Sequence, residues 1–165
     1  ELNALAGFEK SGHFFFRAPY GRGYDDGIVA GRAVLAMLDR AGGKKLSALK
    51  TELPLTWTSP TMSPHCADET KYGVVADITT TYETMFAEGN KILGRSIRDV
   101  NTVNGARVTL EDGSFVLVRA SSNKPEMVVV VESTRSADDM RALFRDEVKP
   151  RLAARPEVGA YNQEV

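Results

Sequence analysis

The sequence is poor in cysteine: its 165 residues include a single one, Cys66, and only two histidines. One thiol cannot form a disulfide within the chain, and a Cys-rich zinc site needs several. No apolar run approaches the roughly 20 residues that a membrane-spanning helix requires. These scarcities exclude a disulfide-stabilised fold and a Cys-rich zinc module. A lone thiol suits a reducing compartment, so we expect a cytoplasmic protein without a membrane partner.

Neither sign of charge predominates. Lys and Arg total 21, and Asp and Glu total 22. A chain so balanced creates no broad positive field, so nucleic acid is not an expected partner. The length suffices for one ordinary domain, or for a small domain and part of another. Because the chain opens with Glu1 and not Met, we expect the natural N-terminus to lie upstream.

Residues 1–53 have the pattern of an incomplete α/β domain. A short strand is expected around Phe14–Phe16, followed by a Gly-rich loop. Asp25 or Asp26 is placed to cap a helix that ends at Gly42-Gly43. A second helical segment reaches Pro54. These few elements cannot enclose a core alone, which predicts the C-terminal part of a larger domain and a tendency to self-associate.

Residues 54–67 contain three prolines among Ser and Thr, which is typical of a linker or hinge. We interpret His65 and Cys66 as ordinary residues of this linker.

Residues 68–155 have the complete pattern of an α+β domain. A helix is indicated from Val75 to Met85 by apolar residues at three- and four-residue steps. A capping box at Ser136 opens a final helix. The turn pairs Asn-Gly and Asp-Gly predict hairpins, and the expected strands are Ile97–Val103, Ala106–Glu111, Ser114–Arg119 and Met127–Glu132. We expect a four-stranded antiparallel sheet with both helices on one face, and a tail over residues 156–165.

The segment Arg119–Pro125, Arg-Ala-Ser-Ser-Asn-Lys-Pro, leads directly into the apolar run Met127–Val131. A phosphate needs a cation that can make two parallel hydrogen bonds, and further neutral donors around it. The candidate phosphate ligands are Arg119, Ser121, Ser122 and Asn123. A plain solvated hairpin connection is the alternative.

A second polar group is Glu9, Ser11 and His13, which stand at alternate positions beside glycines. A carboxylate, a hydroxyl and an imidazole suit the neighbouring hydroxyls of a sugar, and His13 could also transfer a proton. A structural role for His13 is the alternative. Paired acids at Asp25 and Asp26 could bind a metal, but helix capping explains them better, so we expect no metal ligands in this chain.

Three motifs in order resemble the α-D-phosphohexomutases, specifically the bacterial phosphomannomutase/phosphoglucomutase branch. Glu9–His13 resembles the family's Glu-Met-Ser-Gly-His loop, and Tyr24–Ile28 resembles Phe-Asp-Asp-Gly-Ile. Arg119–Pro125 is similar to Arg-Ala-Ser-Asn-Thr-x-Pro. The resemblance implies the end of the third domain and all of the fourth domain of a four-domain isomerase.

The resemblance implies a role for each candidate residue. Glu9 and Ser11 would hold sugar hydroxyls, and His13 would be a candidate for proton transfer. The substrate phosphate would be bound by Arg119, Ser121, Ser122 and Asn123. Ser122 and Asn123 depart from the family's usual Asn and Thr but keep hydrogen-bonding groups. The related phosphoglucosamine mutases carry Arg-Pro-Ser-Gly-Thr-Glu-Pro at this point, which favours hexoses with a plain 2-hydroxyl here.

The resemblance also implies parts that are not in these 165 residues. The family's phosphoserine lies in Thr-Ala-Ser-His-Asn-Pro, and its Mg2+ loop is Asp-Gly-Asp-Gly-Asp-Arg; neither motif occurs here. The expected partners are therefore a hexose phosphate and the N-terminal domains of the same protein. The parent enzyme, a phosphoprotein of carbohydrate metabolism, would use Mg2+ and glucose or mannose 1,6-bisphosphate. This chain alone would be inactive. A non-catalytic phosphate-binding or regulatory module is the alternative.

Overall fold

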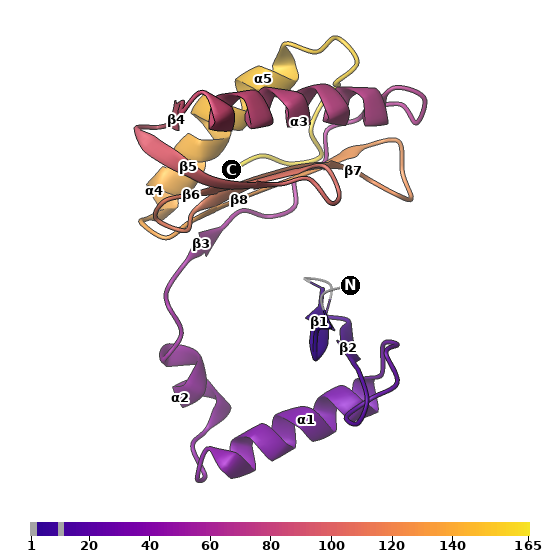
Figure 1. The fold of residues 1–165 in the computed structure, drawn as a ribbon, viewed down its shortest axis with the longest axis vertical. Helices are drawn as coiled ribbons and strands as arrows, with labels where there is room; N and C mark the ends of the chain where they lie inside the picture. Colours follow the sequence, from indigo (N-terminus) through magenta and orange to yellow (C-terminus); the bar gives the residue numbers. More distant parts are fainter. Residues whose placement is uncertain (1–2, 10–11) are drawn as a thin grey trace. The chain divides into compact units, whose positions relative to one another are not determined.

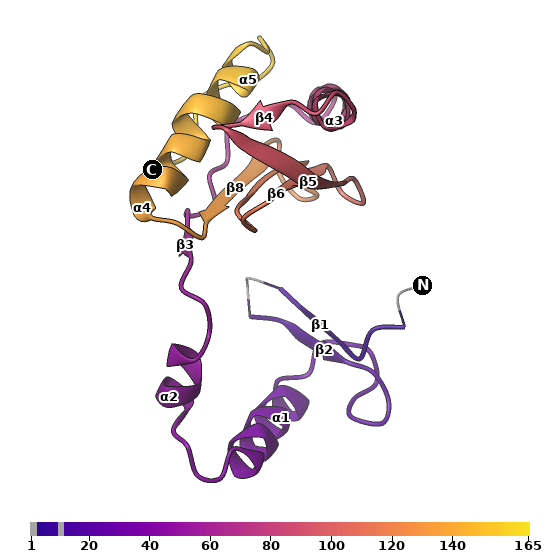
Figure 2. The ribbon, with the colours of Figure 1, turned by 60° about the vertical axis from the view of Figure 1, so that its left-hand side comes forward.

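The computed structural model describes residues 3–9 and 12–165. The chain divides into two compact units, Glu1–Pro54 and Leu55–Val165. Figure 1 and Figure 2 show the elements of each in two views.

The first unit contains a two-stranded antiparallel sheet and two helices. Strand β1 (Ala6–Phe8) pairs with β2 (Phe14–Phe16). Helix α1 (Gly27–Arg40) is capped by Asp26, whose carboxylate accepts hydrogen bonds from the amides of Ile28 and Val29. Helix α2 (Leu46–Thr51) follows. The predicted cap and both helical segments are thus confirmed, with Asp26 and not Asp25 as the capping residue.

The described part of the first unit has no buried core. None of its residues falls in the buried class, and large apolar side chains such as Ile28 and Leu35 of α1 are exposed. A helix with apolar residues on its surface needs a second layer to cover them. That residues 1–53 are the C-terminal part of a larger domain stays a prediction.

The second unit is an antiparallel sheet covered by helices. The four predicted strands are β5 (Arg95–Asn101), β6 (Ala106–Leu110), β7 (Phe115–Ala120) and β8 (Met127–Ser133). Helix α3 (Lys71–Ala87) and the C-terminal helical segment lie on the same face of this sheet (Figures 1 and 2). That segment consists of α4 (Ala137–Ala142), a π-helical stretch η1 (Leu143–Val148) and α5 (Lys149–Ala153). The predicted α+β fold is therefore present.

Two short strands extend the sheet beyond the prediction. The order is β3-β8-β7-β6-β5-β4, with β3 (Trp57–Thr58) beside β8 and β4 (Lys91–Ile92) beside β5. Leu93 and Gly94 connect β4 to β5, and both have positive φ. Two such residues form the type I′ turn that matches the twist of a hairpin. Leucine is not typical of that turn, which is why the sequence pattern did not indicate it.

The prediction of a linker over residues 54–67 is wrong from Leu55 onward. The second unit begins at Leu55, and Met62 exchanges two backbone hydrogen bonds with Val129 of β8. Met62 and Cys66 are fully buried in the core. Prolines fit here because this segment lies at the edge of the sheet. Their missing N–H groups are not needed there, since no further strand of the described residues pairs with the outer side of the segment.

The predicted tail over residues 156–165 also differs from the structure. Gly159 donates to the carbonyl of His65, His65 donates to that of Ala160, and Asn162 donates to that of Ser63. The ring of Tyr161 packs edge-on against Phe144. The last residues therefore hold the segment before α3 against the rest of the unit.

Gly105 forms the turn between β5 and β6 and lies against the backbone of β7. It has φ +78°, and a Cβ there would lie 2.3 Å from the carbonyl oxygen of Val118 and 2.8 Å from Cα of Arg119. Gly89, after α3, has φ +71° but open space around it. The two glycines share a left-handed conformation and differ in the space available to a side chain.

We expect Gly105→Ala to lower the free energy of unfolding by about 2 to 5 kcal/mol, since it adds a steric clash to the cost of left-handed backbone. Gly89→Ala, the matched control, should lose only about 1 to 2 kcal/mol. Urea unfolding followed by fluorescence of Trp57, the single tryptophan, reports on the second unit. Equal losses in the two variants would contradict the close approach of Gly105 to β7.

Asp112 at the β6–β7 turn is an ionised carboxylate that the fold stabilises. Its partial burial opposes ionisation, but hydrogen bonds from the Ser114 amide and from Arg95 outweigh this and lower its pKa from 3.8 to about 2. A depressed pKa stabilises the fold above the unfolded-state pKa. That contribution is lost as the pH falls from about 4 towards 2.

We therefore expect Asp112→Asn to be less stable than the wild type near neutral pH. The difference in free energy of unfolding should shrink as the pH falls towards about 2, because the wild-type carboxylate then becomes neutral as well. Urea unfolding at a series of pH values measures this difference. A gap that stays constant down to about pH 2 would show that the charge of Asp112 does not stabilise the fold.

Candidate functional site

The polar loop after β7 places its candidate residues where a strand ends. Arg119 pairs with Val128 of β8, and Ala120 pairs with Met127. Alternate residues of β7 are buried, Val118 and Ala120 among them, and they belong to the core cluster that includes α3. Because side chains alternate across a strand, Arg119 projects from the face opposite the helices.

Hydrogen bonds close the loop at its base. The amide of Ser121 donates to the carbonyl of Glu126 at 2.9 Å, so the chain leaves β7 and enters β8 at a fixed separation. Between these residues, Ser122 and Asn123 are exposed. Ser121 itself is buried, and its hydroxyl oxygen accepts a long bond of 3.4 Å from the amide of Asn123. Ser121 thus shapes the loop, while the two residues after it face solvent.

The charge of Arg119 is not neutralised by the described part of the protein. Its Nη1 donates to the carbonyl of Ala120 at 3.0 Å, and no carboxylate of the described residues lies within ion-pair distance. Arg95, by contrast, reaches both Asp112 and Asp139. A guanidinium without a carboxylate partner, beside exposed hydroxyl and amide groups, can bind an anion in two-pronged geometry.

The far side of the loop is fixed by residues that sequence reasoning missed. Cys66 donates its amide to the carbonyl of Pro125 at 3.0 Å, and the buried ammonium of Lys71 donates to the carbonyl of Lys124 at 3.0 Å. Asp68 and Lys71 at i and i+3 indicate only a helical ion pair in the sequence. Nothing local indicates a contact across 53 positions.

The second group of candidates lies in the first unit, at the connection between β1 and β2. Glu9 and His13 are linked through their backbones, the amide of Glu9 donating to the carbonyl of His13 at 3.0 Å. Their side chains also approach, with Nδ1 of His13 3.5 Å from a carboxylate oxygen of Glu9. Ser11, predicted to bind a sugar hydroxyl, lies outside the described residues. The hairpin therefore brings Glu9 and His13 together. Their positions four residues apart in the sequence do not by themselves predict this contact.

Asp25 contributes to this group in a way that the sequence did not indicate. Its carboxylate accepts the amide of Phe14 at 3.0 Å and lies 3.8 Å from Nε2 of His13. Asp25 therefore orients the start of β2 and the imidazole, while Asp26 caps α1. His13 stands between two carboxylates, and each of them can accept a hydrogen bond from a ring N–H group.

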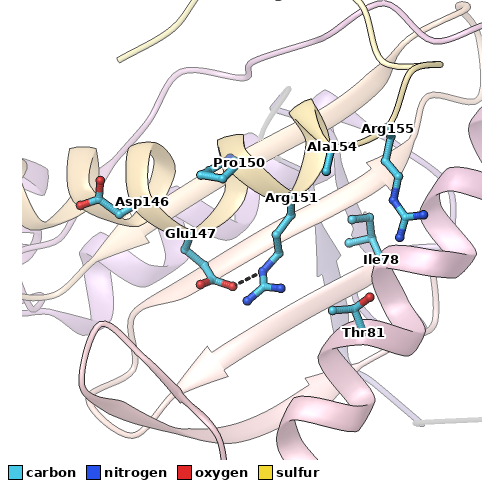
Figure 3. A pocket seen from close by; sticks show the side chains of 8 residues that line it. All are labelled: Ile78, Thr81, Asp146, Glu147, Pro150, Arg151, Ala154 and Arg155. Carbon is cyan, nitrogen blue, oxygen red and sulfur yellow. Dashed lines mark hydrogen bonds and ion pairs between the residues drawn. The ribbon is translucent and has the colours of Figure 1, made fainter.

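A groove between α3 and the C-terminal helical segment offers other charged groups (Figure 3). Its arginines are already paired, Arg151 with Glu147 at 2.6 Å and Arg155 with Asp77 at 3.0 Å. Partial burial of Arg151 opposes its positive charge and lowers the pKa of its guanidinium. The hydrogen bond to Glu147 and the charge of that carboxylate outweigh this effect, so the pKa is raised overall. None of the predicted site residues lines this groove. The loop after β7 is the better anion site because its cation is not neutralised.

The described residues contain no cluster of acidic, His or Cys side chains that could hold a metal ion. Nowhere in residues 3–9 and 12–165 do three or more His, Cys, Asp or Glu side chains gather in a way that could hold a metal ion. We therefore assign no step to a metal in this part of the protein. Over the same residues, no helix is both long and apolar enough to cross a membrane.

Comparison with known proteins gives two family matches and several relatives. The model of "Phosphoglucomutase/phosphomannomutase, alpha/beta/alpha domain III" matches residues 1–56, and that of the family's C-terminal domain matches residues 68–149. A probable phosphoglucosamine mutase of Methanothermobacter thermautotrophicus is 30% identical over 107 residues, 65% of this chain and 21% of the relative. A phosphopentomutase of Thermococcus kodakarensis is 32% identical over 108 residues, 66% of this chain and 22% of the relative.

A solved structure aligns with most of this chain. The phosphoglucomutase/phosphomannomutase family protein of Burkholderia thailandensis aligns with a TM-score of 0.67 and 27% identity, covering 94% of this chain and 30% of its own. The chain thus spans about a fifth of the length of the two curated relatives. Because the two family models together match most of its residues, this chain belongs to the phosphoglucomutase/phosphomannomutase family.

Proposed function

We propose that this chain is the sugar- and phosphate-binding C-terminal part of a phosphohexomutase. The complete enzyme interconverts hexose 6-phosphate and hexose 1-phosphate through a bisphosphorylated intermediate. The observation that carries the proposal is Arg119, whose guanidinium has no carboxylate partner among the described residues and which stands beside an anchored polar loop. Membership of a family of sugar-phosphate mutases supports the reaction class.

The phosphate is bound in this proposal by the loop after β7. Arg119 supplies the charge and two parallel N–H donors, and Ser122 and Asn123 add neutral donors from the exposed part of the loop. Ser121 contributes through the shape of the loop and through its hydroxyl. Arg119 and residues 121–123 together form the proposed phosphate grip. Because the grip binds a phosphate and makes no contact that depends on the sugar carbon attached to it, it can hold either end of the bisphosphorylated intermediate when that intermediate turns around.

The sugar is bound by the β1–β2 hairpin. Glu9 accepts hydrogen bonds from hydroxyl groups, Ser11 adds a hydroxyl, and His13 is placed to take or return a proton at the reacting oxygen. Asp25 orients His13 through its contact with the ring. These are binding and proton-transfer roles, so the phosphoryl donor belongs to another part of the enzyme.

The remaining partners follow from what the chain does not supply. The phosphoserine and the Mg2+ ligands belong to N-terminal domains, which would also cover the exposed apolar side chains of α1. Self-association through the same face is the expected behaviour without those domains. The chain alone is inactive, with or without glucose or mannose 1,6-bisphosphate. Mannose and glucose phosphates are the proposed substrates, although relatives are named for glucosamine and pentose phosphates.

The phosphate grip can be tested in the 165-residue chain by titrating the 15N-labelled protein with inorganic phosphate. We expect amide shifts that saturate over residues 119–124 and that are lost in Arg119→Ala, since the variant removes the cation. Arg107→Ala is the matched control: Arg107 projects from the neighbouring strand β6 towards Phe115 and Thr109, away from the loop. Its phosphate response should equal that of the wild type.

Addition of glucose 6-phosphate to the same samples distinguishes the enzyme part from a non-catalytic phosphate-binding module. The enzyme part should show a further response at Glu9 and His13, because these are the proposed sugar-binding residues. A response confined to residues 119–124 for both ligands would favour the non-catalytic module. No response at the loop to either ligand would remove the phosphate grip altogether.

In the complete enzyme, Arg119→Ala should raise KM for hexose phosphate by about 10- to 100-fold, because hydrogen bonds to a charged group contribute about 1.5 to 3 kcal/mol. A smaller loss of kcat is expected where the grip also orients the intermediate. Steady-state kinetics with glucose 1-phosphate and mannose 1-phosphate measure both constants. Unchanged kinetics would eliminate Arg119 as a phosphate ligand.

A further inference from the structure

Lys71 is a buried cation at the start of α3 that reaches the loop after β7. Its relative exposure is 2%, and its Nζ lies 2.5 Å from a carboxylate oxygen of Asp68. The same ammonium donates to the carbonyl of Lys124 at 3.0 Å and lies 5.2 Å from the centroid of the Tyr72 ring. The contact with Lys124 joins two segments 53 residues apart.

The carbonyl of Lys124 is held by two donors at once. Besides Lys71, it accepts the amide of Glu126 at 2.8 Å, two residues further along the chain. This is the hydrogen bond of a three-residue γ-turn, and Pro125 at its centre has the fixed φ that suits the common form. The direction of one peptide group is therefore set from inside the loop and from α3.

The peptide that Lys71 holds ends the exposed part of the loop. At the other end, Ser121 is tied to Glu126. Ser122 and Asn123 lie between these two anchors and pair with no strand. Within the segment, the amide of Asn123 makes only the long bond of 3.4 Å to the Ser121 hydroxyl. The backbone amides can therefore converge on an anion only if both ends of the segment keep their orientation.

Stability alone does not account for a buried ammonium at this position. Burying a charge costs several kcal/mol, and replacing a buried ion pair by apolar side chains is often neutral. Asp68 is 64% exposed, so its attraction to Lys71 is weakened by solvent. What an apolar side chain could not supply is a donor for the Lys124 carbonyl.

We propose that Lys71 is a positioning residue of the phosphate grip. It holds the Lys124 peptide so that the amides of residues 122–124 stay arranged for a phosphate, and it acts through the loop without touching the ligand. The inference rests on the proposed function of that loop. It adds a residue of α3 to a site whose other members belong to β7 and the loop.

The test compares Lys71→Met with Arg95→Met in the 165-residue chain. Arg95 is equally buried, but it contacts Asp112 and Asp139 at the opposite end of β7. Both variants lose a buried cation, and only one of them loses a contact with the loop. Differences between the two therefore separate positioning from a general loss of stability.

The first readout is hydrogen exchange without any ligand. In Lys71→Met, the amides of Ser121 and Glu126 should exchange at least about tenfold faster relative to the core amide of Val129, because the loop opens locally. In Arg95→Met, the ratio should stay at its wild-type value. A ratio that is unchanged in Lys71→Met, or raised equally in both variants, would overturn the inference.

The second readout is affinity for inorganic phosphate from amide shifts of residues 119–124. We expect Lys71→Met to weaken binding about 5- to 10-fold, the value of one hydrogen bond, and Arg95→Met to leave it unchanged. A wild-type response that persists unaltered in Lys71→Met would overturn this inference and leave the phosphate grip intact. No response in the wild type would overturn the grip itself, and the inference with it.

Asp68→Ala serves if Lys71→Met does not fold. Asp68 is largely exposed, so its loss leaves the fold in place. The variant removes the carboxylate that holds the Lys71 ammonium next to the carbonyl of Lys124, so this contact should weaken. Both readouts should move in the same direction as in Lys71→Met, by smaller amounts. If neither moves in this folded variant, Lys71 does not position the loop.

Discussion

The antiparallel pairing of β7 with β8 is the interaction on which the second unit depends. It runs from Phe115 opposite Glu132 to Ala120 opposite Met127. Met127, Val129 and Val131 project into the core beneath the helices, and each is fully buried. The same register places Arg119 on the other face. A shift of one residue would exchange these two sets of side chains, so the core and the candidate site are fixed by one set of backbone hydrogen bonds.

Local sequence patterns predicted the part of the fold that local chemistry determines. Asn104-Gly105 and Asp112-Gly113 mark hairpins because glycine adopts left-handed backbone at low cost, as Gly105 and Gly113 do here. Ser136 caps the final helix as expected. The edge strand β3 and the docking of residues 158–162 were missed because their partners are distant in sequence. A Pro-rich composition is shared by a free linker and by an edge segment, and only the pairing with β8 distinguishes them.

For the candidate site, too, the sequence predicted the groups that are adjacent in the chain and missed the contacts between distant residues. Arg119 and the loop after it were found because hydroxyl, amide and guanidinium groups are adjacent in the sequence. Lys71 was not found, since its partner is a backbone carbonyl, and every residue has one. Asp25 was first interpreted as a capping residue beside Asp26, yet it accepts the amide of Phe14. Side-chain types can suggest which ligands a site prefers, but the groups that hold a loop in place appear only in three dimensions.

The two units differ in whether they have a hydrophobic core of their own. This difference separates the proposed phosphate-binding loop from the proposed sugar-binding hairpin. The second unit has a closed core from Met62 to Leu152, and the loop is anchored from within it by Cys66 and Lys71. The contacts that hold the proposed phosphate-binding loop therefore come from within the second unit. The described residues of the first unit have no buried core, so Glu9 and His13 rest on a hairpin that needs further layers. The phosphate-binding loop is in this sense the autonomous half of the proposed site, and the sugar-binding hairpin is the half whose stability depends on further layers of the enzyme.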